Sequence, residues 1–469
     1  MVVLDSVRKD VFDDHAPRLH ELAAAAAPAC RAASSWTVPS HASMLTGELP
    51  HRHGVHSHDR DFSRVAGDTV LDELPHRAVG VSANTYLGGA FGADALFDEF
   101  HEVSQYRRFA DGDDVYAIIR ESDATGLGLY RDAVAAALRS DHPLLTLANG
   151  AALKLRGALA GAPVATPFDD GTAAACDVAA TAAASADEPF AMVVNLMEAH
   201  PPFQRVRGYD DVGALADVPA GWTSREFDLW AVNERGERDA NAANLERFRA
   251  CYRAAVDYLD RHVTDLVERL RAATDRETTV VVTADHGENL GYEGDDGLVG
   301  HVGSLSEGLL HVPLLVIDPP EGAALDGFDG GYLSQLALPE LLRGLATGDL
   351  DADDLVGGTA AAELVGGISE DADVPLDDDR RRHWNRMQRA VYDGDEKVVW
   401  DSEGTVSWYG VGDGACRQRR LDRDDPVPEE ARARFETPIR EYKEHASRDD
   451  RPAEIDAATA RDLERLGYL

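Results

Sequence analysis

Five short apolar runs, separated by helical stretches, constrain the fold of this chain more than any other feature. Each run is continuous rather than alternating, and most are rich in valine, which is typical of strands buried on both faces of a parallel sheet. They span residues 2–4, 78–82, 191–196, 279–283 and 312–317. Residues 130–138 and 241–273 have helical patterns, and the longer stretch carries apolar side chains every three or four positions. The alternation predicts an α/β fold with a doubly wound, mostly parallel sheet flanked by helices.

The length of 469 residues exceeds one ordinary core, so we expect a large domain and a smaller one. Residues 1–356 contain the predicted sheet. Residues 357–379 are rich in glycine and acidic side chains and are predicted to form a loop or linker. Residues 380–469 are predicted to form a small C-terminal α+β subdomain with a charged tail. Its strand-like runs at 388–392, 397–401 and 405–409 are separated by Asp-Gly and Glu-Gly turns, which indicates antiparallel pairing.

The charge balance is strongly acidic. The chain has 85 acidic and 46 basic residues, a formal net charge of -39, and only four lysines. Such a field repels nucleic acid and anionic lipid, so the composition argues against both as partners. Because the acidic residues are spread along the chain, the composition resembles that of proteins from salt-accumulating halophiles. In salt of about 1 M the Debye length falls to about 3 Å, which screens the self-repulsion of such a fold.

Neither the cysteines nor the apolar segments indicate a secreted or membrane-spanning protein. Cys30, Cys176, Cys251 and Cys416 are far apart and have no CxxC spacing, which argues against a disulfide framework or a zinc site. No uninterrupted apolar stretch approaches the roughly 18 residues of a spanning helix. No basic segment followed by an apolar one opens the chain. We therefore expect a cytoplasmic protein without a membrane span.

Polar residues follow two of the predicted strands directly. Asp5 ends the first run, and Asp285 and His286 follow the fourth. The carboxyl ends of parallel strands meet at one edge of an open α/β sheet, where such folds bind their ligands. Two carboxylates, an imidazole and the nearby hydroxyl of Thr37 suit one divalent ion such as Mn²⁺, Mg²⁺, Ca²⁺ or Zn²⁺. Each residue also has an ordinary alternative: Asp5 can cap a turn, and Thr37 can cap the helix that Pro39 opens.

Several motifs in a fixed order resemble those of sulfatase-like enzymes in the alkaline phosphatase superfamily. The segment Ser35-Trp-Thr-Val-Pro-Ser-His-Ala-Ser-Met-Leu-Thr-Gly47 resembles their nucleophile segment. Leu4-Asp-Ser-Val-Arg8 precedes it, and Asn195-Leu-Met-Glu-Ala-His-Pro-Pro202 and Thr283-Ala-Asp-His-Gly-Glu288 follow. The resemblance covers about residues 1–317. It implies an α/β enzyme that transfers a phosphoryl or sulfuryl group at one metal ion held by Asp5, Thr37, Asp285 and His286.

Two departures from the family pattern bear on the chemistry. Sulfatases carry Cys or Ser at the position that Thr37 occupies here and oxidise it to formylglycine. The methyl group on the β-carbon of threonine would make the oxidised product a ketone, which disfavours the usual sulfatase reaction. A threonine hydroxyl is instead similar to the nucleophile of phosphodiesterases and phosphoglycerol transferases in the superfamily. His41 replaces the family's arginine, so either His41 contacts the substrate or the substrate contacts differ.

The resemblance implies further roles. His200 would protonate the leaving group or hold a substrate oxygen, and His301 would bind the transferred group. Asn84 either donates a hydrogen bond to the substrate or is a turn asparagine. Glu198, His200 and His301 could hold a second metal ion, but one ion is the preferred interpretation. We expect Arg8 and His311 to be structural, and the histidines at 51, 53, 56 and 58 to lie in a partly solvated loop.

The sequence therefore predicts a metal-dependent hydrolase or transferase that acts on a phosphate ester (a mono- or diester or a phosphonate) through Thr37. The substrate would be a small molecule or a glycan-linked ester. Two alternatives stay open: a sulfate-ester hydrolase that works without formylglycine, and a non-catalytic glycan-binding protein in which the metal is structural.

Overall fold

The structure is a computed structural model. It describes residues 1–103, 108–109, 111–120, 122, 124, 126–159, 162, 164–209, 215–273, 276–366, 376–412, 414–448, 455, 459–460 and 463.

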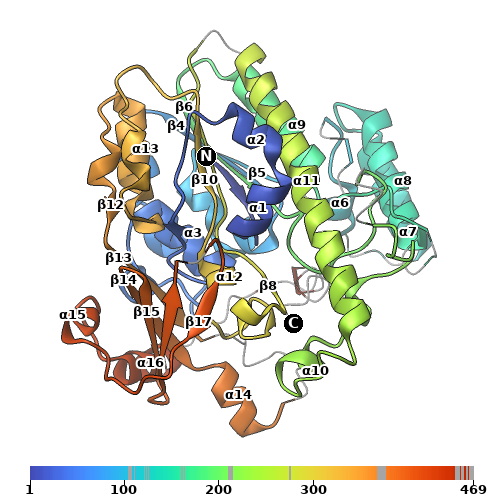
Figure 1. Cartoon of the computed structure of the whole chain (residues 1–469). Helices are drawn as coiled ribbons and strands as arrows, with labels where there is room; N and C mark the ends of the chain where they lie inside the picture. Colours follow the sequence, from blue (N-terminus) through green and yellow to red (C-terminus); the bar gives the residue numbers. More distant parts are fainter. Residues whose placement is uncertain are drawn as a thin grey trace.

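A seven-stranded sheet forms the centre of the molecule (Figure 1). Its order is β2-β10-β7-β1-β6-β4-β5. The strands are β1 (Val2–Leu4), β2 (Ala25–Ala26), β4 (Arg77–Ser82), β5 (Glu99–Glu102), β6 (Phe190–Leu196), β7 (Val280–Thr283) and β10 (Leu314–Ile317). The pairs β7-β1, β1-β6, β6-β4 and β4-β5 are parallel. The predicted fold class, a mostly parallel α/β sheet flanked by helices, is confirmed.

One predicted strand runs the other way. Residues 312–317 were expected to be parallel, but β10 is antiparallel to β7. Between β7 and β10 the chain holds only short elements: β8 (Asn289–Leu290), the 3-10 helix η6 (Glu293–Asp295), β9 (Val299–Gly300) and α12 (Glu307–Leu310). A parallel return needs a crossover, usually a helix that carries the chain back to the other edge of the sheet. Because the segment between β7 and β10 lacks such a crossover, it leaves and re-enters the sheet at the same edge, and β10 is therefore antiparallel to β7.

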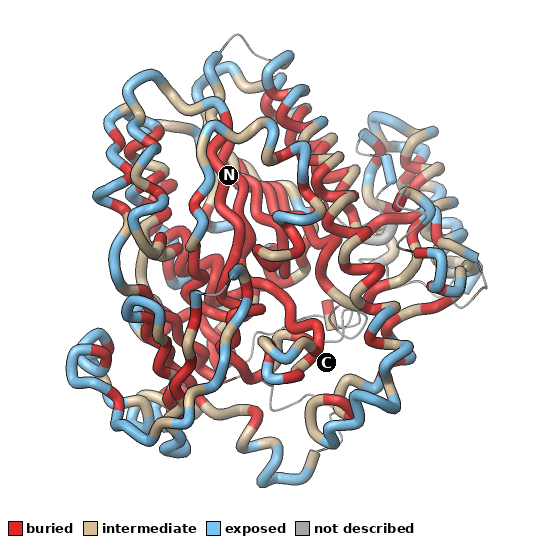
Figure 2. The backbone as a smooth tube through the Cα atoms, in the orientation of Figure 1, coloured by how far each residue is buried: buried red, intermediate tan, exposed pale blue. Residues whose placement is uncertain are grey.

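Two groups of helices cover the sheet. One group packs around the long helix α11 (Ala242–Ala273) and contains α1 (Lys9–His15), α2 (Pro17–Leu22) and α9 (Thr172–Ser185). The other contains α3 (Thr37–Thr46), α5 (Val70–Glu73) and α13 (Leu338–Thr347). The predicted apolar face of α11 is buried from Phe248 to Leu270. Figure 2 shows the strands buried between these layers.

The C-terminal residues form a separate antiparallel sheet of five strands. They are β13 (Thr359–Val365), β14 (Met387–Asp393), β15 (Glu396–Asp401), β16 (Val406–Val411) and β17 (Gln418–Arg420). The middle three match the predicted strands. The predicted loop at 357–379 is wrong over Thr359–Val365, because seven residues of this alanine-rich segment pair in register with β14 and tertiary pairing overrides weak strand propensity. Residues 367–375 lie outside the described residues, and the domain limits stay a prediction.

A buried ionic network joins the C-terminal sheet to the α/β core. Glu307, 1% exposed, accepts from Arg31 Nη2 at 2.9 Å and from Lys397 Nζ at 3.0 Å. Tyr392 Oη donates to the same carboxylate at 2.5 Å. Burial would raise the pKa of Glu307, but Arg31 and then Lys397 outweigh it and lower that pKa to about 2. The C-terminal sheet is therefore held to the α/β core by a carboxylate that stays ionised.

We expect Glu307→Gln to lower the free energy of unfolding by about 3–5 kcal/mol, because it leaves buried cations unpaired. Urea unfolding measures the change. The control Glu48→Gln removes a partly exposed pair with Arg52 and should cost about 1 kcal/mol or less. Since the folded pKa lies below the ordinary 4.5, the contribution of Glu307 is complete above pH 4.5 and disappears as the pH falls towards 2. Equal effects of the two substitutions at pH 7 would contradict the network's role.

Candidate active site

The predicted site residues come from neighbouring strands and meet at one edge of the sheet. Asp5 follows β1, Asp285 and His286 follow β7, His200 follows β6, and Asn84 follows β4. Because β1 pairs with both β6 and β7, and β6 pairs with β4, all of these strands deliver their carboxyl ends to the same place.

Asp5, Asp285 and His286 form a candidate metal site. One ligand atom from each lies within 4.8 Å of the others, and all three side chains are fully buried. His286 Nε2 lies 3.5 Å from Asp285 Oδ2 and 3.9 Å from Asp5 Oδ1. Among the described residues, neither Asp285 Oδ2 nor His286 Nε2 finds a hydrogen-bond partner. Buried polar atoms without partners are costly, and carboxylate and imidazole donors suit a divalent ion, so these residues fit one.

The electrostatics of the cluster agree with that fit. Burial raises the pKa of Asp285 well above its usual value, and the nearby Asp5 raises it further. Burial also acts to raise the pKa of Asp5, but His200, His286 and His41 outweigh it and lower that pKa. Burial, with His301 next, lowers the pKa of His286 to about 3. The imidazole is therefore neutral at pH 7, and two buried carboxylates face each other, which is a state that a divalent cation stabilises.

Backbone amides hold Asp285 in place. Its Oδ1 accepts from the amides of Ser6 at 3.1 Å and His286 at 2.8 Å, which leaves Oδ2 for another ligand. Ser6 has a φ of 62°, a left-handed conformation that residues other than glycine rarely adopt. The strained turn after β1 thus aims an amide at the carboxylate of another strand. Sequence reasoning missed Ser6, because nothing in its local pattern signals this conformation.

Thr37 is the first residue of α3. Trp36 precedes it in the extended conformation at the N-cap, so the alternative of Thr37 as the helix cap is wrong. Its hydroxyl donates to Asp5 Oδ2 at 3.3 Å, and the residue is 1% exposed. The start of α3 therefore places the hydroxyl against a carboxylate of the metal cluster.

Asn84 contacts Asp5 directly. Its Nδ2 donates to Asp5 Oδ2 at 2.7 Å, while its Oδ1 accepts from the amide of Tyr86 at 2.8 Å. Asn84 is thus a turn asparagine, as one interpretation held, and its side chain also orients a candidate metal ligand. A contact with substrate stays a prediction.

We expect Asn84→Ala to weaken metal binding about 10- to 100-fold, because residues that orient a metal ligand typically have effects of that size. Calorimetric titration with Mn²⁺ measures the affinity. The matched control is Asn149→Ala. Asn149 is also buried and donates to a backbone carbonyl, but it is not part of the metal cluster. Unchanged Mn²⁺ affinity in the Asn84 variant would contradict the assigned role.

His41 is engaged by protein groups on both ring nitrogens. Nδ1 lies 2.9 Å from the carbonyl of Thr37 and 3.6 Å from Asp285 Oδ2, and Nε2 lies 3.3 Å from Asn195 Nδ2. Donation from Nδ1 to the carbonyl is the tautomer that this network assigns. Burial lowers the pKa of His41 to about 4, so it is neutral at pH 7. In this state it does not supply the positive charge of the arginine that it replaces.

His200 and His301 lie side by side above the cluster. Their ring centroids are 5.1 Å apart, and His301 lies 4.9 Å from His286. Burial lowers the pKa of His200 to about 4. Burial also acts to lower the pKa of His301, but the Glu288 carboxylate, 2.8 Å from its Nδ1, outweighs it and raises that pKa. His301 is thus the more basic of the two. Glu288 is the last residue of a motif noted in the sequence, but the sequence indicated no role for it.

The second metal site considered from the sequence does not form around Glu198. That carboxylate accepts from Tyr209 Oη at 2.7 Å and Thr172 Oγ1 at 3.0 Å. Within the described residues, Asp5, Asp285 and His286 are the one group whose ligand atoms converge.

The other singled-out residues have contacts of their own. Arg8 bonds to Asp10 and Asp295, and His311 Nε2 lies 2.8 Å from the carbonyl of Pro28. The expectation of a partly solvated histidine loop is wrong for His56 and His58, which are buried. Helix α16 (Ile439–Arg448) packs against them, with the Tyr442 ring 6.0 Å from that of His56 and Lys443 Nζ 2.7 Å from His58 Nε2.

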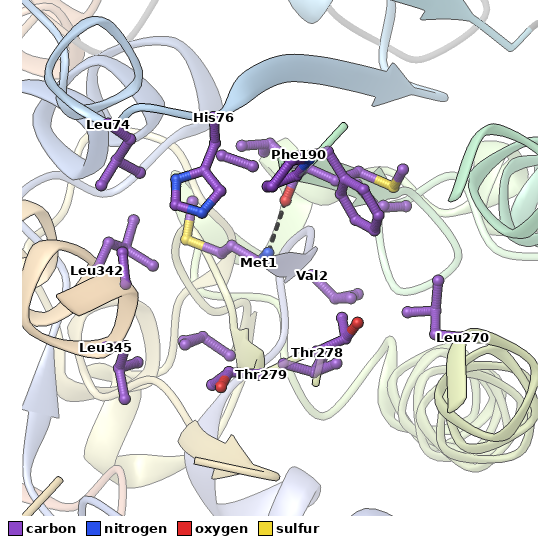
Figure 3. A pocket seen from close by; sticks show the side chains of 18 of the residues that line it. Met1, Val2, Leu74, His76, Phe190, Leu270, Thr278, Thr279, Leu342 and Leu345 are labelled. Carbon is purple, nitrogen blue, oxygen red and sulfur yellow. Dashed lines mark hydrogen bonds between the residues drawn. The ribbon is translucent and has the colours of Figure 1, made fainter. Parts of the chain in front are cut away.

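A cavity of about 360 Å³ lies at the opposite, amino-terminal edge of the sheet (Figure 3). Met1 and Phe190 open β1 and β6 in its wall, and Leu342 of α13 and Leu270 of α11 face it from the two helix layers. None of the predicted site residues lines this cavity, so it is separate from the candidate active site.

Comparisons with known proteins agree with this arrangement. The family model described as Sulfatase matches residues 2–336. No curated protein sequence matches the chain significantly. Among solved structures, a phosphonate monoester hydrolase of Agrobacterium radiobacter has a TM-score of 0.55 at 16% identity, covering 87% of this chain and 88% of its own. The phosphonate monoester hydrolase from Silicibacter pomeroyi has a TM-score of 0.50 at 18% identity, covering 89% of both chains.

A third similar structure is described as bound to its substrate D-glucosamine-2-N,6-O-disulfate. It has a TM-score of 0.53 at 13% identity and covers 87% of this chain and 90% of its own. Structural similarity at such low identity shows the shared fold, while the family match covers most of this chain. The predicted enzyme class, a sulfuric or phosphoric ester hydrolase, is confirmed. This chain belongs to the sulfatase family, within the alkaline phosphatase superfamily.

Proposed function

We propose that this protein hydrolyses phosphate esters (mono- or diesters or phosphonates) of a small molecule or a glycan, with Thr37 as the nucleophile. The observation that carries the proposal is the Thr37 hydroxyl, buried and 3.3 Å from Asp5, beside unpartnered ligand atoms of Asp285 and His286. One divalent ion would be held by Asp5, Thr37, Asp285 and His286. When bound, it would lower the pKa of the hydroxyl and stabilise negative charge on the transferred group.

The residue type at position 37 favours phosphate over sulfate. Formylglycine requires an aldehyde, and threonine cannot give one because its β-carbon carries a methyl group. The hydroxyl itself must therefore attack, which is the mode of covalent catalysis that suits phosphorus centres. The sulfatase family match favours the second candidate, a sulfate-ester hydrolase that works without formylglycine.

Asp5, His200 and His301 would each act at a different step of the reaction. Asp5 accepts the hydrogen bond of the Thr37 hydroxyl and takes its proton as Oγ1 attacks phosphorus. The bond from phosphorus to the leaving oxygen breaks, and phosphothreonine forms. His301, the more basic of the two histidines because Glu288 raises its pKa, donates a proton to the leaving oxygen, while the neutral His200 hydrogen-bonds the same group. His301 then accepts a proton from the water that attacks phosphorus, the bond from phosphorus to Oγ1 breaks as phosphate is released, and Asp5 returns its proton to Oγ1, which restores Thr37.

The test is mass spectrometry of the protein after incubation with Mn²⁺ in high salt and a panel of aryl esters. The panel contains a phosphate monoester, a phosphate diester, a phosphonate ester and a sulfate. A phosphate-sized adduct on the peptide that contains Thr37, with release of the aryl alcohol, would support the proposal. Faster release from the sulfate than from every phosphorus ester would favour the second candidate. No release from any ester by metal-loaded protein would contradict both.

A further inference from the structure

Exposed apolar side chains are concentrated in one part of the molecule. Every large apolar side chain that is exposed in the described part of the chain lies between Phe109 and Val164. This segment follows β5 and precedes α9, and it contains α6 (Val115–Arg120), α7 (Leu127–Ala137) and α8 (Pro143–Leu159). The three helices pack on one another and stand beside α11, away from the central sheet (Figure 1).

Helix α7 presents its large apolar side chains outward. Leu127 is 88% exposed, Tyr130 53%, Val134 47%, and Leu138, at the C-cap, 61%. The spacing of three and four residues places them on one stripe of the helix. The buried face of α7 carries the small residues Ala133 and Ala137 instead. This is the reverse of an ordinary surface helix, whose apolar stripe faces the core.

Helix α8 shows the same reversal. Leu144 is 81% exposed and Leu155 is 49% exposed, whereas the polar residues Thr146 and Asn149 are buried. Asn149 Nδ2 donates to the carbonyl of Phe109 at 3.0 Å, and Thr146 Oγ1 accepts from the amide of Asp113 at 2.8 Å. Polar groups thus help to hold α8 to the protein, while Leu144 and Leu155 face the solvent.

The two helices form one surface, which we call the α7–α8 surface and define as the exposed side chains of residues 126–159. Lys154 Nζ of α8 lies 5.0 Å from the ring centroid of Tyr130 on α7. The stretch 126–159 contains four basic and two acidic residues, in a chain with 85 acidic and 46 basic residues. Arg131, Arg139 and Lys154 are exposed, and Arg131 pairs with the neighbouring Asp132 at 3.0 Å. Arg139 and Lys154 thus add positive charge to an apolar surface on a protein that is otherwise strongly acidic.

We propose that the α7–α8 surface docks this protein on an anionic lipid bilayer. Exposed leucines can enter the acyl boundary, while Tyr130, Arg131 and Lys154 reach the anionic headgroups, the arrangement that interfacial helices use. No described helix is long and apolar enough to cross a membrane, so the contact is peripheral. A second copy of the chain would present the same cationic surface and is not complementary to it. The acidic composition of the whole chain argued against anionic lipid as a partner. That argument rests on the average charge, whereas docking depends on the charge of the surface that touches the bilayer.

The surface is connected to the segment that carries His200. Arg156 of α8 donates to the carbonyl of Asp169 at 3.0 Å and to Asp170 Oδ1 at 3.0 Å. The amide of Asp170 donates to Glu198 Oε2 at 3.1 Å, two residues before His200. Docking would therefore hold the protein by a layer of helices that contacts the edge of the candidate active site.

Vesicle flotation of the full chain tests the proposal. Vesicles of phosphatidylglycerol and phosphatidylcholine are compared with vesicles of phosphatidylcholine alone, over a salt range in which circular dichroism shows the native fold. We expect the protein to float with the anionic vesicles and at least about tenfold less with the neutral ones. Leu127→Ser with Leu144→Ser should lower binding about tenfold or more, because two nearly fully exposed leucines lose their burial in lipid.

A charge variant and a matched control separate the local surface from general charge. Arg131→Gln with Lys154→Gln should weaken binding to anionic vesicles, most strongly at the lowest salt. Arg382→Gln with Arg448→Gln removes two exposed cations from other helices and should leave binding unchanged. Hydrolysis of a water-soluble ester should be the same in all of these variants, so a failure of docking is distinguishable from a failure of the proposed function.

Two results would overturn the proposal. One is no flotation of the native protein with anionic vesicles at any salt concentration. The other is a concentration-dependent dimer, seen by gel filtration with light scattering and abolished by the two leucine substitutions, together with no vesicle binding. That second result would assign the surface to another copy of the chain.

Discussion

Replacing Thr37 with valine should lower the turnover of phosphorus esters by at least about a thousandfold, or about 4 kcal/mol in activation free energy. Valine has the shape of threonine and replaces the hydroxyl with a methyl group. Because Thr37 is 1% exposed at the start of α3, this substitution leaves the packing intact and removes the hydroxyl, which is the proposed nucleophile, a proposed metal ligand and the donor to Asp5. Binding and charge stabilisation by the remaining residues would account for residual turnover.

Two controls make this result specific. Thr37→Ser keeps a hydroxyl at the same place and should retain turnover within about tenfold of the native protein. Thr46→Val changes the same residue type at the other end of α3, where the hydroxyl donates to the carbonyl of Ala42, and should leave turnover unchanged. Steady-state kinetics with the best aryl ester measures all three. Native turnover in the valine variant would exclude Thr37 as the nucleophile.

The second large effect is expected on the stability of Asp285→Asn relative to the native protein, and its sign depends on whether metal is present. Without metal the native protein buries two facing carboxylates, and burial with Asp5 raises the pKa of Asp285. The variant removes that repulsion, so in a chelator it should be at least as stable as the native protein. With Mn²⁺ at about a thousand times its Kd, the native protein should gain about 4 kcal/mol by linkage, and the variant should gain little.

Thermal unfolding with and without Mn²⁺ measures these changes. The control is Asp260→Asn, because Asp260 is equally buried but accepts from the amide of Leu19 and from Arg18, far from the cluster. That variant should be destabilised in both conditions and should keep the full gain from Mn²⁺. An equal gain in Asp285→Asn and in the native protein would show that the ion binds elsewhere.

Much of the fold could be predicted from local patterns. A short, continuous run of apolar residues is typical of a strand that is buried on both faces of a sheet. The predicted strands at 78–82, 191–196 and 279–283 accordingly match β4, β6 and β7. The direction of β10 could not be predicted, because it depends on whether the connection crosses the sheet, and residues 284–313 carry no signal for that. Strand β13 was missed because alanine and glutamate do not favour strands, and only its pairing with β14 makes it one.

The candidate site shows a similar division. The residues Asp5, Asp285 and His286 could be grouped from sequence, because strand ends in a parallel sheet converge. Contacts that depend on side-chain rotamers could not, such as the bond of Asn84 to Asp5 or the pairing of Glu288 with His301. The mean charge of the chain also concealed the α7–α8 surface, since an average over the whole sequence does not report where exposed charges gather.

The position of β13 has a consequence for any shortened form of this enzyme. The amide of Glu363 donates to the carbonyl of Ala33 at 2.9 Å, and Ser34 Oγ donates to the carbonyl of Glu363 at 2.7 Å. These bonds brace the backbone just ahead of Thr37, and they come from beyond residue 336, where the family match ends. A gene trimmed to the matched region would encode every proposed catalytic side chain and still lack the strand that steadies the nucleophile. In protein engineering, the C-terminal sheet should therefore be treated as part of the catalytic apparatus and exchanged between homologues only together with the segment it braces.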